Sequence, residues 1–368
     1  MKLLAVNWRD LKNPDAGGAE VHLHEILSRM VKRGHEVVLF SANFPGGDEE
    51  DSYDGIKVFR KGSWYNANYI LPIAVRSYLK RNDCDLVIED INKIPFFLPV
   101  FVKQRVLAIV PHLFGSTVFR ETNPLFATYV LMWERFIPFV YEMCHFVAIS
   151  ESTKEDLMRR GLHEPRIEVS LCGLDHSTYK LLDGVPRFEE PTIVHFGRIR
   201  KYKSIDVVMK AFVEIRKKLE NAKLIIAGDG PEKANLERLS AKLGLGDSIR
   251  FLGQVKTDAL VELLNKSHLF INASSKEGWG LTVLEANACG VPVVASDRPG
   301  LKDSVKEGKT GYLVEYGRPD AFAEKALELL SDPIKWNAMS AAALDWARSL
   351  TWERTAEEIE KIIIREVS

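Results

Sequence analysis

Short apolar runs alternate with amphipathic stretches along most of this chain. In the first half, apolar runs of strand length occupy residues 3–7, 36–42, 56–59, 86–90, 106–110, 146–150 and 167–171. Between the first two runs, residues 19–30 carry apolar side chains at helical spacing, and Gly34 follows as a helix-terminating glycine. Apolar strands separated by helices are typical of a parallel sheet that is covered on both faces. The first half therefore predicts a Rossmann-like α/β domain.

The same pattern starts again after residue 191. Residues 181–191 contain two prolines and three acidic residues and show little periodicity, which favours a linker. Apolar runs return at residues 192–197, 223–228, 249–253, 268–272 and 291–296, and the chain is helical in pattern from residue 319 onward. We expect an α/β protein of two Rossmann-like domains with parallel sheets, facing each other across an interdomain cleft. The expected boundaries are 1–180, a linker at 181–191, 192–350, and a C-terminal helix at 351–368 that can cross back to the N-terminal domain.

Composition narrows the class of protein. A chain of 368 residues exceeds the size of one typical hydrophobic core, which agrees with two domains. The net charge of −1 gives no overall attraction to nucleic acid, so no nucleic-acid partner is expected. The four cysteines are scattered beside apolar runs, which favours reduced thiols. No signal-peptide pattern or long apolar span is present, and we expect a cytoplasmic protein, with the inner membrane face as the alternative location.

Glycine-rich and polar residues follow the predicted strands in both halves. Gly17 and Gly18 stand where the first helix begins, and a basic loop containing Arg198 and Lys203 follows the strand at 192–197. Ligands in open α/β sheets bind beyond the carboxyl ends of the strands, which is where these residues fall. The loop could neutralise a diphosphate, because guanidinium and ammonium groups both bind phosphate oxygens. A solvated surface loop and an ordinary turn remain the alternatives.

The segment SSKEGWGLTVLEANACG at residues 274–290 is the most informative stretch. Its glycines permit close approach of the backbone to a ligand, and the helix predicted at 280–288 would direct free amides toward an anion. Glu277 and Glu285 are eight residues apart, about 12 Å along a helix. They could accept hydrogen bonds from hydroxyl groups on opposite sides of a phosphate. The alternative is a helix-capping charge and a surface residue.

Other patterns exclude several classes of site. No dinucleotide fingerprint, P-loop or serine-hydrolase elbow is present. The acidic pair Asp83 and Asp85 precedes its strand instead of following it, which favours a surface turn over a metal site. His22 and His24 are two residues apart on a helix and so point to different sides. We therefore expect neither a metal nor another cofactor.

Taken in order, several motifs resemble the retaining family 4 glycosyltransferases of GT-B fold. They are AGGAE, RGHEVVLF, FVAISESTKEDL, HFGRIRKYKS, IIAGDGP and EGWGLTVLEANACGVPVVASDRPG, and they extend over nearly the whole chain. The resemblance implies a hexosyltransferase that uses a UDP- or GDP-sugar. It also implies an acceptor-binding N-terminal domain and a C-terminal domain that binds the nucleotide sugar. Two departures are Ser204, where the family often has Gly, and Trp279, where Phe is more usual.

The resemblance also assigns residues. It implies four catalytic positions, which are Arg198, Lys203, Glu277 and His112. It implies donor contacts at Gly17, Gly18, Gly278, Trp279, Gly280, Leu281, Thr282, Glu285, Gly230 and Gln254. In these roles Arg198 and Lys203 contact the diphosphate and Glu285 contacts the ribose. Glu277 holds the transferred sugar.

The acceptor is less defined. The resemblance implies a glycan or lipid-linked acceptor in cell-envelope polysaccharide or glycolipid synthesis. Residues 64–81 and 126–143 mix aromatic and basic side chains, which fits peripheral contact with a membrane, although core helices have the same composition. A non-catalytic nucleotide-sugar-binding or scaffold protein and a nucleotide-sugar epimerase of similar fold are the alternative functions.

Overall fold

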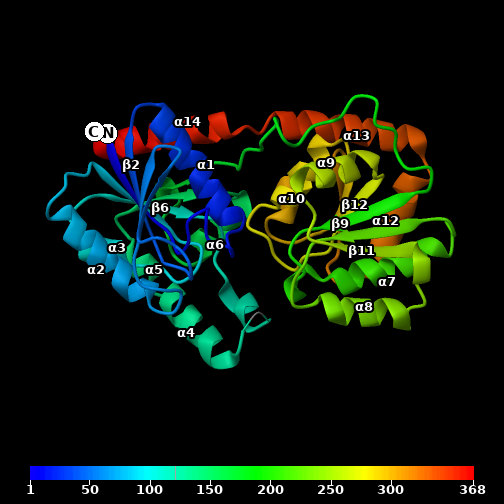
Figure 1. Ribbon diagram of the computed structural model, residues 1–368, viewed down its shortest axis with the longest axis horizontal. Helices are drawn as coiled ribbons and strands as arrows, with labels where there is room; N and C mark the ends of the chain where they lie inside the picture. The colour runs from blue at the N-terminus through cyan, green and yellow to red at the C-terminus, as the bar shows by residue number, and fades with distance from the viewer. Residues whose placement is uncertain (121) are drawn as a thin grey trace. The chain divides into compact units, whose positions relative to one another are not determined.

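A computed structural model describes residues 1–120 and 122–368 and divides into two compact units (Figure 1). The first unit comprises residues 1–173 and 352–368, and the second comprises residues 174–351. Each unit is a sheet with helices on both faces. The predicted pair of Rossmann-like α/β domains is thereby confirmed.

The first unit is built on an eight-stranded sheet of order β3-β4-β2-β1-β5-β6-β7-β8. Its strands are β1 (Lys2–Val6), β2 (Glu36–Ser41), β3 (Glu50–Tyr53), β4 (Ile56–Arg60), β5 (Leu86–Asp90), β6 (Val106–Val110), β7 (His145–Ala148) and β8 (Ile167–Val169). The pairing is parallel except between β3 and β4, which form an antiparallel edge hairpin. The central strands are buried along their whole length, as apolar parallel strands require.

Helices cover both faces of this sheet. On one face, α1 (Gly18–Lys32) lies beside α14 (Trp352–Val367), and both contribute to a core cluster with β1 and β2 (Figure 1). The other core cluster contains residues from α2 (Ala67–Leu79), α3 (Leu98–Phe101), α4 (Pro124–Glu134), α5 (Ile137–Val140) and α6 (Glu151–Arg159). The C-terminal helix thus completes the first unit, because its Ile359 and Ile363 are fully buried there.

The second unit has a parallel six-stranded sheet of order β11-β10-β9-β12-β13-β14. Its strands are β9 (Thr192–Phe196), β10 (Lys223–Ala227), β11 (Ile249–Gly253), β12 (Leu269–Asn272), β13 (Val293–Ser296) and β14 (Gly311–Val314). One core cluster involves α7 (Ile205–Arg216), α8 (Lys233–Lys242), α12 (Pro319–Leu330) and α13 (Pro333–Arg348). The opposite cluster involves α9 (Thr257–Lys266), α10 (Leu281–Ala288) and α11 (Leu301–Ser304).

The segment that we interpreted as a linker is held against the second unit. The backbone N–H of Leu182 donates to Asn265 Oδ1 at 2.8 Å. The Arg187 guanidinium donates to the carbonyl oxygens of Leu264 and Ser267, at 3.0 and 2.6 Å, where α9 ends. Residues 181–191 accordingly belong to the compact second unit, which comprises residues 174–351.

Candidate functional site

The carboxyl ends of β9, β10 and β11 come together through backbone hydrogen bonds. Gly228 N–H donates to the carbonyl of Gly253 at 2.7 Å, and Ile199 N–H donates to the carbonyl of Asp229 at 2.8 Å. Gly230 has φ of +156°, and a Cβ there would lie 2.2 Å from the carbonyl oxygen of Ile199. Only glycine allows this approach. The loops carrying Arg198, Gly230 and Gln254 therefore share one edge of the sheet, and Arg198 and Gln254 are exposed there.

The basic loop between β9 and α7 has a defined conformation. Ser204, the residue that precedes α7, has φ of +49°, in the left-handed region that favours glycine. Glycine, which the resemblance implies is frequent at this position, would adopt this conformation without strain. The carbonyl of Tyr202 accepts a hydrogen bond from Ser275 N–H at 2.8 Å. That bond ties the basic loop to the start of the segment 274–290.

Lys203 and Glu277 form an ion pair across this junction. Lys203 Nζ lies 2.6 Å from Glu277 Oε1, and the two side chains are 9% and 14% exposed. Burial alone would lower the pKa of Lys203, but Glu277 and Tyr202 together more than offset this effect, so the pKa lies above its usual value. His195 lies near this pair, and burial lowers its pKa to about 4. Its ring is therefore neutral near pH 7.

The glycine-rich turn leads directly into α10. Gly280 precedes the helix with φ of +94°, and Leu281 and Thr282 form the first turn, where backbone amides lack intrahelical acceptors. Trp279 is buried at 2% exposure beside Gly278. A Cβ on Gly300 would lie 2.4 Å from the carbonyl oxygen of Glu277, so the backbone of the turn passes directly against residue 300.

Glu285 lies within α10 and is only partly exposed. Burial raises its pKa to about 7, against the opposing effects of Lys203 and the Tyr179 hydroxyl. Tyr179 comes from the segment that precedes β9, and our sequence reasoning did not identify it. Its own pKa is raised by burial and by the charge of Glu285. The second unit therefore places a basic loop, a glycine-rich helix start and two carboxylates at one edge of its sheet.

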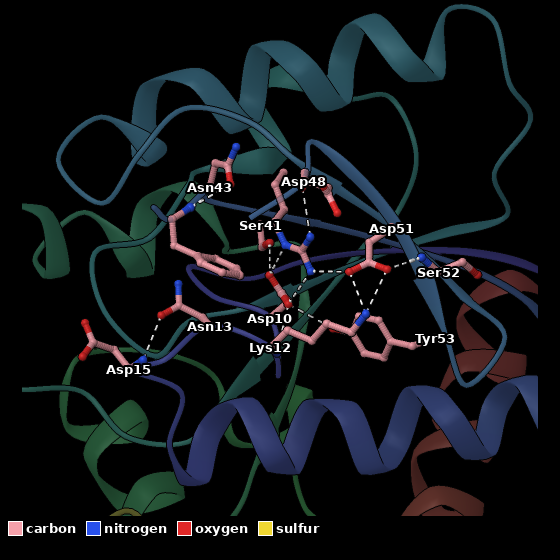
Figure 2. Close-up of polar contacts among 12 residues, drawn as sticks. Asp10, Lys12, Asn13, Asp15, Ser41, Asn43, Asp48, Asp51, Ser52 and Tyr53 are labelled. Atoms are coloured by element: carbon pink, nitrogen blue, oxygen red, sulfur yellow. Dashed lines mark hydrogen bonds and ion pairs between the residues drawn. The ribbon is translucent and has the colours of Figure 1, made fainter. Parts of the chain in front are cut away.

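The first unit supplies the loop that leads to Gly17 and Gly18. Figure 2 shows that Asp10, near the start of this loop, lies within a polar network. Arg60 on β4 donates to both carboxylate oxygens of Asp10, from Nε at 2.7 Å and Nη2 at 2.9 Å. At the other end, Gly17 N–H donates to the Glu20 carboxylate at 2.7 Å. Sequence reasoning missed Arg60, because an arginine in a short strand ordinarily indicates an exposed position.

His112, the remaining predicted residue, follows β6 in the first unit. Its ring packs edge-on against Phe114 with 5.4 Å between the ring centroids. The Glu134 carboxylate fixes this loop by accepting hydrogen bonds from the backbone N–H groups of Phe114 and Gly115. Gly17, Gly18 and His112 thus belong to one unit, and the other predicted site residues belong to the second.

The acidic pair Asp83 and Asp85, which the sequence offered as a weak candidate for a metal site, has other partners in the structure. Asp85 accepts a hydrogen bond from Lys2 N–H at 2.7 Å, and Asp83 lies 3.6 Å from Lys2 Nζ, as in a surface turn. Within residues 1–120 and 122–368, no group of three or more His, Cys, Asp and Glu side chains is placed to hold a metal ion. Metal independence itself stays a prediction.

Family comparisons match both halves of the chain. The family described as "Glycosyltransferase Family 4" matches residues 16–178, and the family described as "Glycosyl transferases group 1" matches residues 184–346. The second match contains the basic loop, the glycine-rich turn and both glutamates. The first contains Gly17, Gly18 and His112.

Individual proteins are similar to part or all of the chain. N-acetyl-alpha-D-glucosaminyl L-malate synthase of Bacillus anthracis is 39% identical over 143 residues, which cover 39% of this chain and 37% of that protein. The GDP-mannose-dependent alpha-(1-6)-phosphatidylinositol monomannoside mannosyltransferase of Mycobacterium tuberculosis is 32% identical, covering 46% of this chain and 46% of that protein. The chain thus matches less than half the length of each of these two relatives. Sucrose-phosphate synthase from Thermosynechococcus elongatus has the same fold, with a TM-score of 0.82, 18% identity and coverage of 99% and 98%.

Proposed function

The chain belongs to the family 4 glycosyltransferases of GT-B fold, and from this premise we propose that it is a retaining hexosyltransferase. Its donor would be a UDP- or GDP-sugar, and its acceptor a hydroxyl group on a glycan or a lipid-linked molecule. The observation that carries the proposal is the set of residues at one edge of the second sheet. Arg198 and Lys203 supply positive charge there, and Glu277 and Glu285 supply acceptors for hydroxyl groups.

The proposed chemistry requires stabilisation of a departing nucleoside diphosphate. As the bond between the anomeric carbon and the phosphate oxygen breaks, Arg198, Lys203 and the first turn of α10 face the growing negative charge. The acceptor oxygen bonds to the anomeric carbon on the same face, and its proton passes to the departing phosphate oxygen. Glu277 and Glu285 position the sugar and the ribose without attacking. Gly17, Gly18 and His112 of the first unit keep the roles that the resemblance implies for them.

Thermal unfolding with a panel of UDP, GDP and their sugars tests this proposal. A ligand that binds only the native state raises the Tm by mass action. We expect one nucleotide to give a selective shift that persists in EDTA, and the intact sugar nucleotide to give a further shift. The absence of a shift with every nucleotide would favour the scaffold alternative. Conversion of the donor sugar without an acceptor would favour the epimerase.

We further propose that the first unit binds a membrane surface that carries the acceptor. Large apolar side chains are exposed on and around α2, α4 and α5, and together we call them the aromatic surface. They are Trp64 (71%), Tyr65 (68%), Tyr69 (52%), Ile73 (60%), Leu125 (87%), Phe126 (45%), Met132 (46%), Phe136 (46%), Phe139 (75%) and Met143 (76%). The Tyr69 and Tyr129 hydroxyl groups lie 2.6 Å apart and join α2 to α4. Scattered apolar residues need no explanation, but a continuous patch indicates a binding surface.

Charge supports an anionic lipid surface as the partner. Residues 64–82, on the α2 side of the aromatic surface, contain Arg76, Lys80 and Arg81 and no acidic residue, whereas residues 125–143 contain Arg135 and two glutamates. Basic side chains beside interfacial aromatic groups add attraction to anionic lipids. The Mycobacterium tuberculosis relative is named for a phosphatidylinositol mannoside, which is a lipid. Among the described residues no helix is both long and apolar enough to cross a membrane.

Vesicle flotation separates this proposal from an ordinary surface. We expect the protein to float with vesicles of phosphatidylglycerol and phosphatidylcholine, and much less with phosphatidylcholine alone. Trp64→Ser combined with Phe139→Ser should lower the bound fraction severalfold. Ile334→Ser, at a residue that is 84% exposed on α13, is the matched control and should bind as the wild type does. No flotation of the wild type, or equal loss in the control, would contradict the proposal.

A further inference from the structure

In the proposed donor site, the positive charge of Lys203 is neutralised by the carboxylate of Glu277. Within the described residues, Glu277 is the carboxylate bonded to Lys203 Nζ, at 2.6 Å. Both side chains are largely buried, so the pair is screened less than a surface pair would be. Lys203 is also the residue expected to bind the donor diphosphate. A phosphate oxygen that reaches Lys203 must therefore compete with the carboxylate of Glu277.

The backbone around the pair is fixed, so this competition can be resolved by side chains alone. Ser275 N–H is bonded to the carbonyl of Tyr202 at 2.8 Å, and Glu277 N–H is bonded to the carbonyl of Pro299 at 3.1 Å. The contact with Gly300 leaves no room for the turn to shift toward α11. Lys203 can change partner by rotating its flexible side chain, which carries three hydrogen-bond donors.

A carboxylate that loses its lysine needs another hydrogen-bond donor. Among the side chains nearest to the pair, His195 cannot supply a charge, because it is neutral and fully buried. Its Nδ1 lies 2.9 Å from the carbonyl oxygen of Ile271, and its Nε2 has no hydrogen-bond partner among the described residues. A partly buried carboxylate without a partner is costly. The hydroxyl groups of a donor sugar could satisfy Glu277, whereas a nucleoside diphosphate lacks that sugar.

We infer that Glu277 makes the donor site discriminate against the free nucleoside diphosphate. When the intact donor binds, its phosphate takes Lys203 and its sugar hydroxyl groups take Glu277, so the exchange is balanced. When the nucleoside diphosphate binds alone, Glu277 loses its lysine and keeps only the solvent that reaches its 14% exposed side chain. After transfer, the same imbalance favours return of Lys203 to Glu277 and release of the product. This inference rests on the proposed function and gives Glu277 a role in specificity beyond holding the sugar.

Calorimetric titration of Glu277→Gln tests the inference with UDP, GDP, UDP-glucose, UDP-N-acetylglucosamine and GDP-mannose, in EDTA and without acceptor. We expect the variant to bind the nucleoside diphosphate roughly threefold to tenfold more tightly than the wild type, because a competing carboxylate is gone. Binding of the intact donor should not tighten, so the preference for donor over product falls. Glu277→Ala provides a second variant, because glutamine can still accept a bond from Lys203.

Asp206→Asn is the matched control. Asp206 is an exposed acid at the start of α7, paired with Lys210 at 2.7 Å, and its removal changes the local net charge without touching Lys203. It should alter nucleotide affinity less than twofold. If the wild type binds a nucleoside diphosphate and both Glu277 variants bind it equally or more weakly, the inference is overturned and the proposed function stands. If no form of the protein binds any nucleotide, the inference and the proposed function are both refuted.

Discussion

Replacing Arg60 with methionine should destabilise the first unit strongly. Arg60 and Asp10 are 1% and 0% exposed by side chain. In the network of Figure 2, the guanidinium donates twice to Asp10, once to Asp51 at 3.0 Å and once to the carbonyl of Asp48 at 2.9 Å. Methionine fills similar volume but removes every donor. The Asp10 carboxylate would then remain buried without its cation.

The expected loss of unfolding free energy in Arg60→Met depends on the hydrogen bonds that Asp10 keeps. Breaking a buried ion pair by removing one partner costs about 3–5 kcal/mol. Asp10 still accepts hydrogen bonds from Ser41 Oγ at 3.0 Å, Tyr53 Oη at 3.2 Å and Lys12 N–H at 3.0 Å. These bonds place the expected loss near the lower limit, about 3 kcal/mol. Asp10→Asn in the same chain removes the uncompensated charge, and the double variant should recover at least about 1 kcal/mol.

Urea unfolding followed by circular dichroism measures both effects. Lys57→Met is the control, because Lys57 is exposed on the same strand and loses the same charge. It should shift the free energy of unfolding by less than about 0.5 kcal/mol. A loss below about 1 kcal/mol in Arg60→Met would refute the reasoning. So would a double variant whose loss equals the sum of the two single losses.

The stabilisation that the Arg60–Asp10 pair provides depends on pH, and the direction of this dependence follows from the pKa of Asp10. Burial would raise the pKa of Asp10, but Arg60, Ser41 and Lys12 N–H together lower it below its usual value. The stabilisation is therefore present above the unfolded pKa of about 4 and is lost as the pH falls through the lower folded pKa. Without Arg60 the carboxyl group binds its proton more readily. The penalty of Arg60→Met should accordingly shrink as the pH is lowered from 7 toward 4.

Three further predictions concern the second unit. Arg198→Ala should lower kcat more than tenfold, because it removes charge stabilisation of the leaving diphosphate; steady-state transfer assays measure this, and near-normal turnover would contradict it. Gly300→Ala should lower the Tm and weaken donor binding together, since its Cβ would meet the carbonyl oxygen of Glu277 at 2.4 Å, and an unchanged Tm would count against this packing. Because the folded pKa of Glu285 is raised to about 7, its ionisation destabilises the fold as the pH rises from about 5 to 8, by about 1–3 kcal/mol. Glu285→Gln should flatten that decline in urea titrations, and an unchanged slope would refute it.

Much of the fold could be predicted because apolar strands dominate it. The predicted run 86–90 coincides with β5, since buried parallel strands have few polar residues. The predicted run 249–253 coincides with β11, an edge strand in which buried or half-buried residues alternate with exposed ones. The strand β3 was missed because its sequence, EDSY, alternates exposed and half-buried residues at the sheet edge. The strand β14 was missed because its four residues, GYLV, lie between glycine-containing loops.

The candidate site was predictable only in part, for a related reason. Motifs at strand ends locate loops, but they do not show which side chains pair across 74 residues, as Lys203 and Glu277 do. Tyr179 stands in a segment without periodicity, so nothing in its surroundings along the chain indicates its proximity to Glu285. Arg60 lies in a strand whose pattern resembles an ordinary edge strand. These contacts are set by tertiary packing, which local sequence patterns do not encode.

The ion pairs formed by Arg60 and by Lys203 have different physical consequences. Arg60 has carboxylate and carbonyl partners on three segments and no side-chain exposure beyond 1%, so no ligand can replace any of them without unfolding the loop. Lys203 has one carboxylate partner and remains 9% exposed, so another anion can approach and take that partner's place. A fully satisfied buried charge fixes a conformation, whereas a singly paired one at a strand end can exchange. That difference gives the pair in the first unit a structural role and supports the ligand exchange that we propose for the pair in the second.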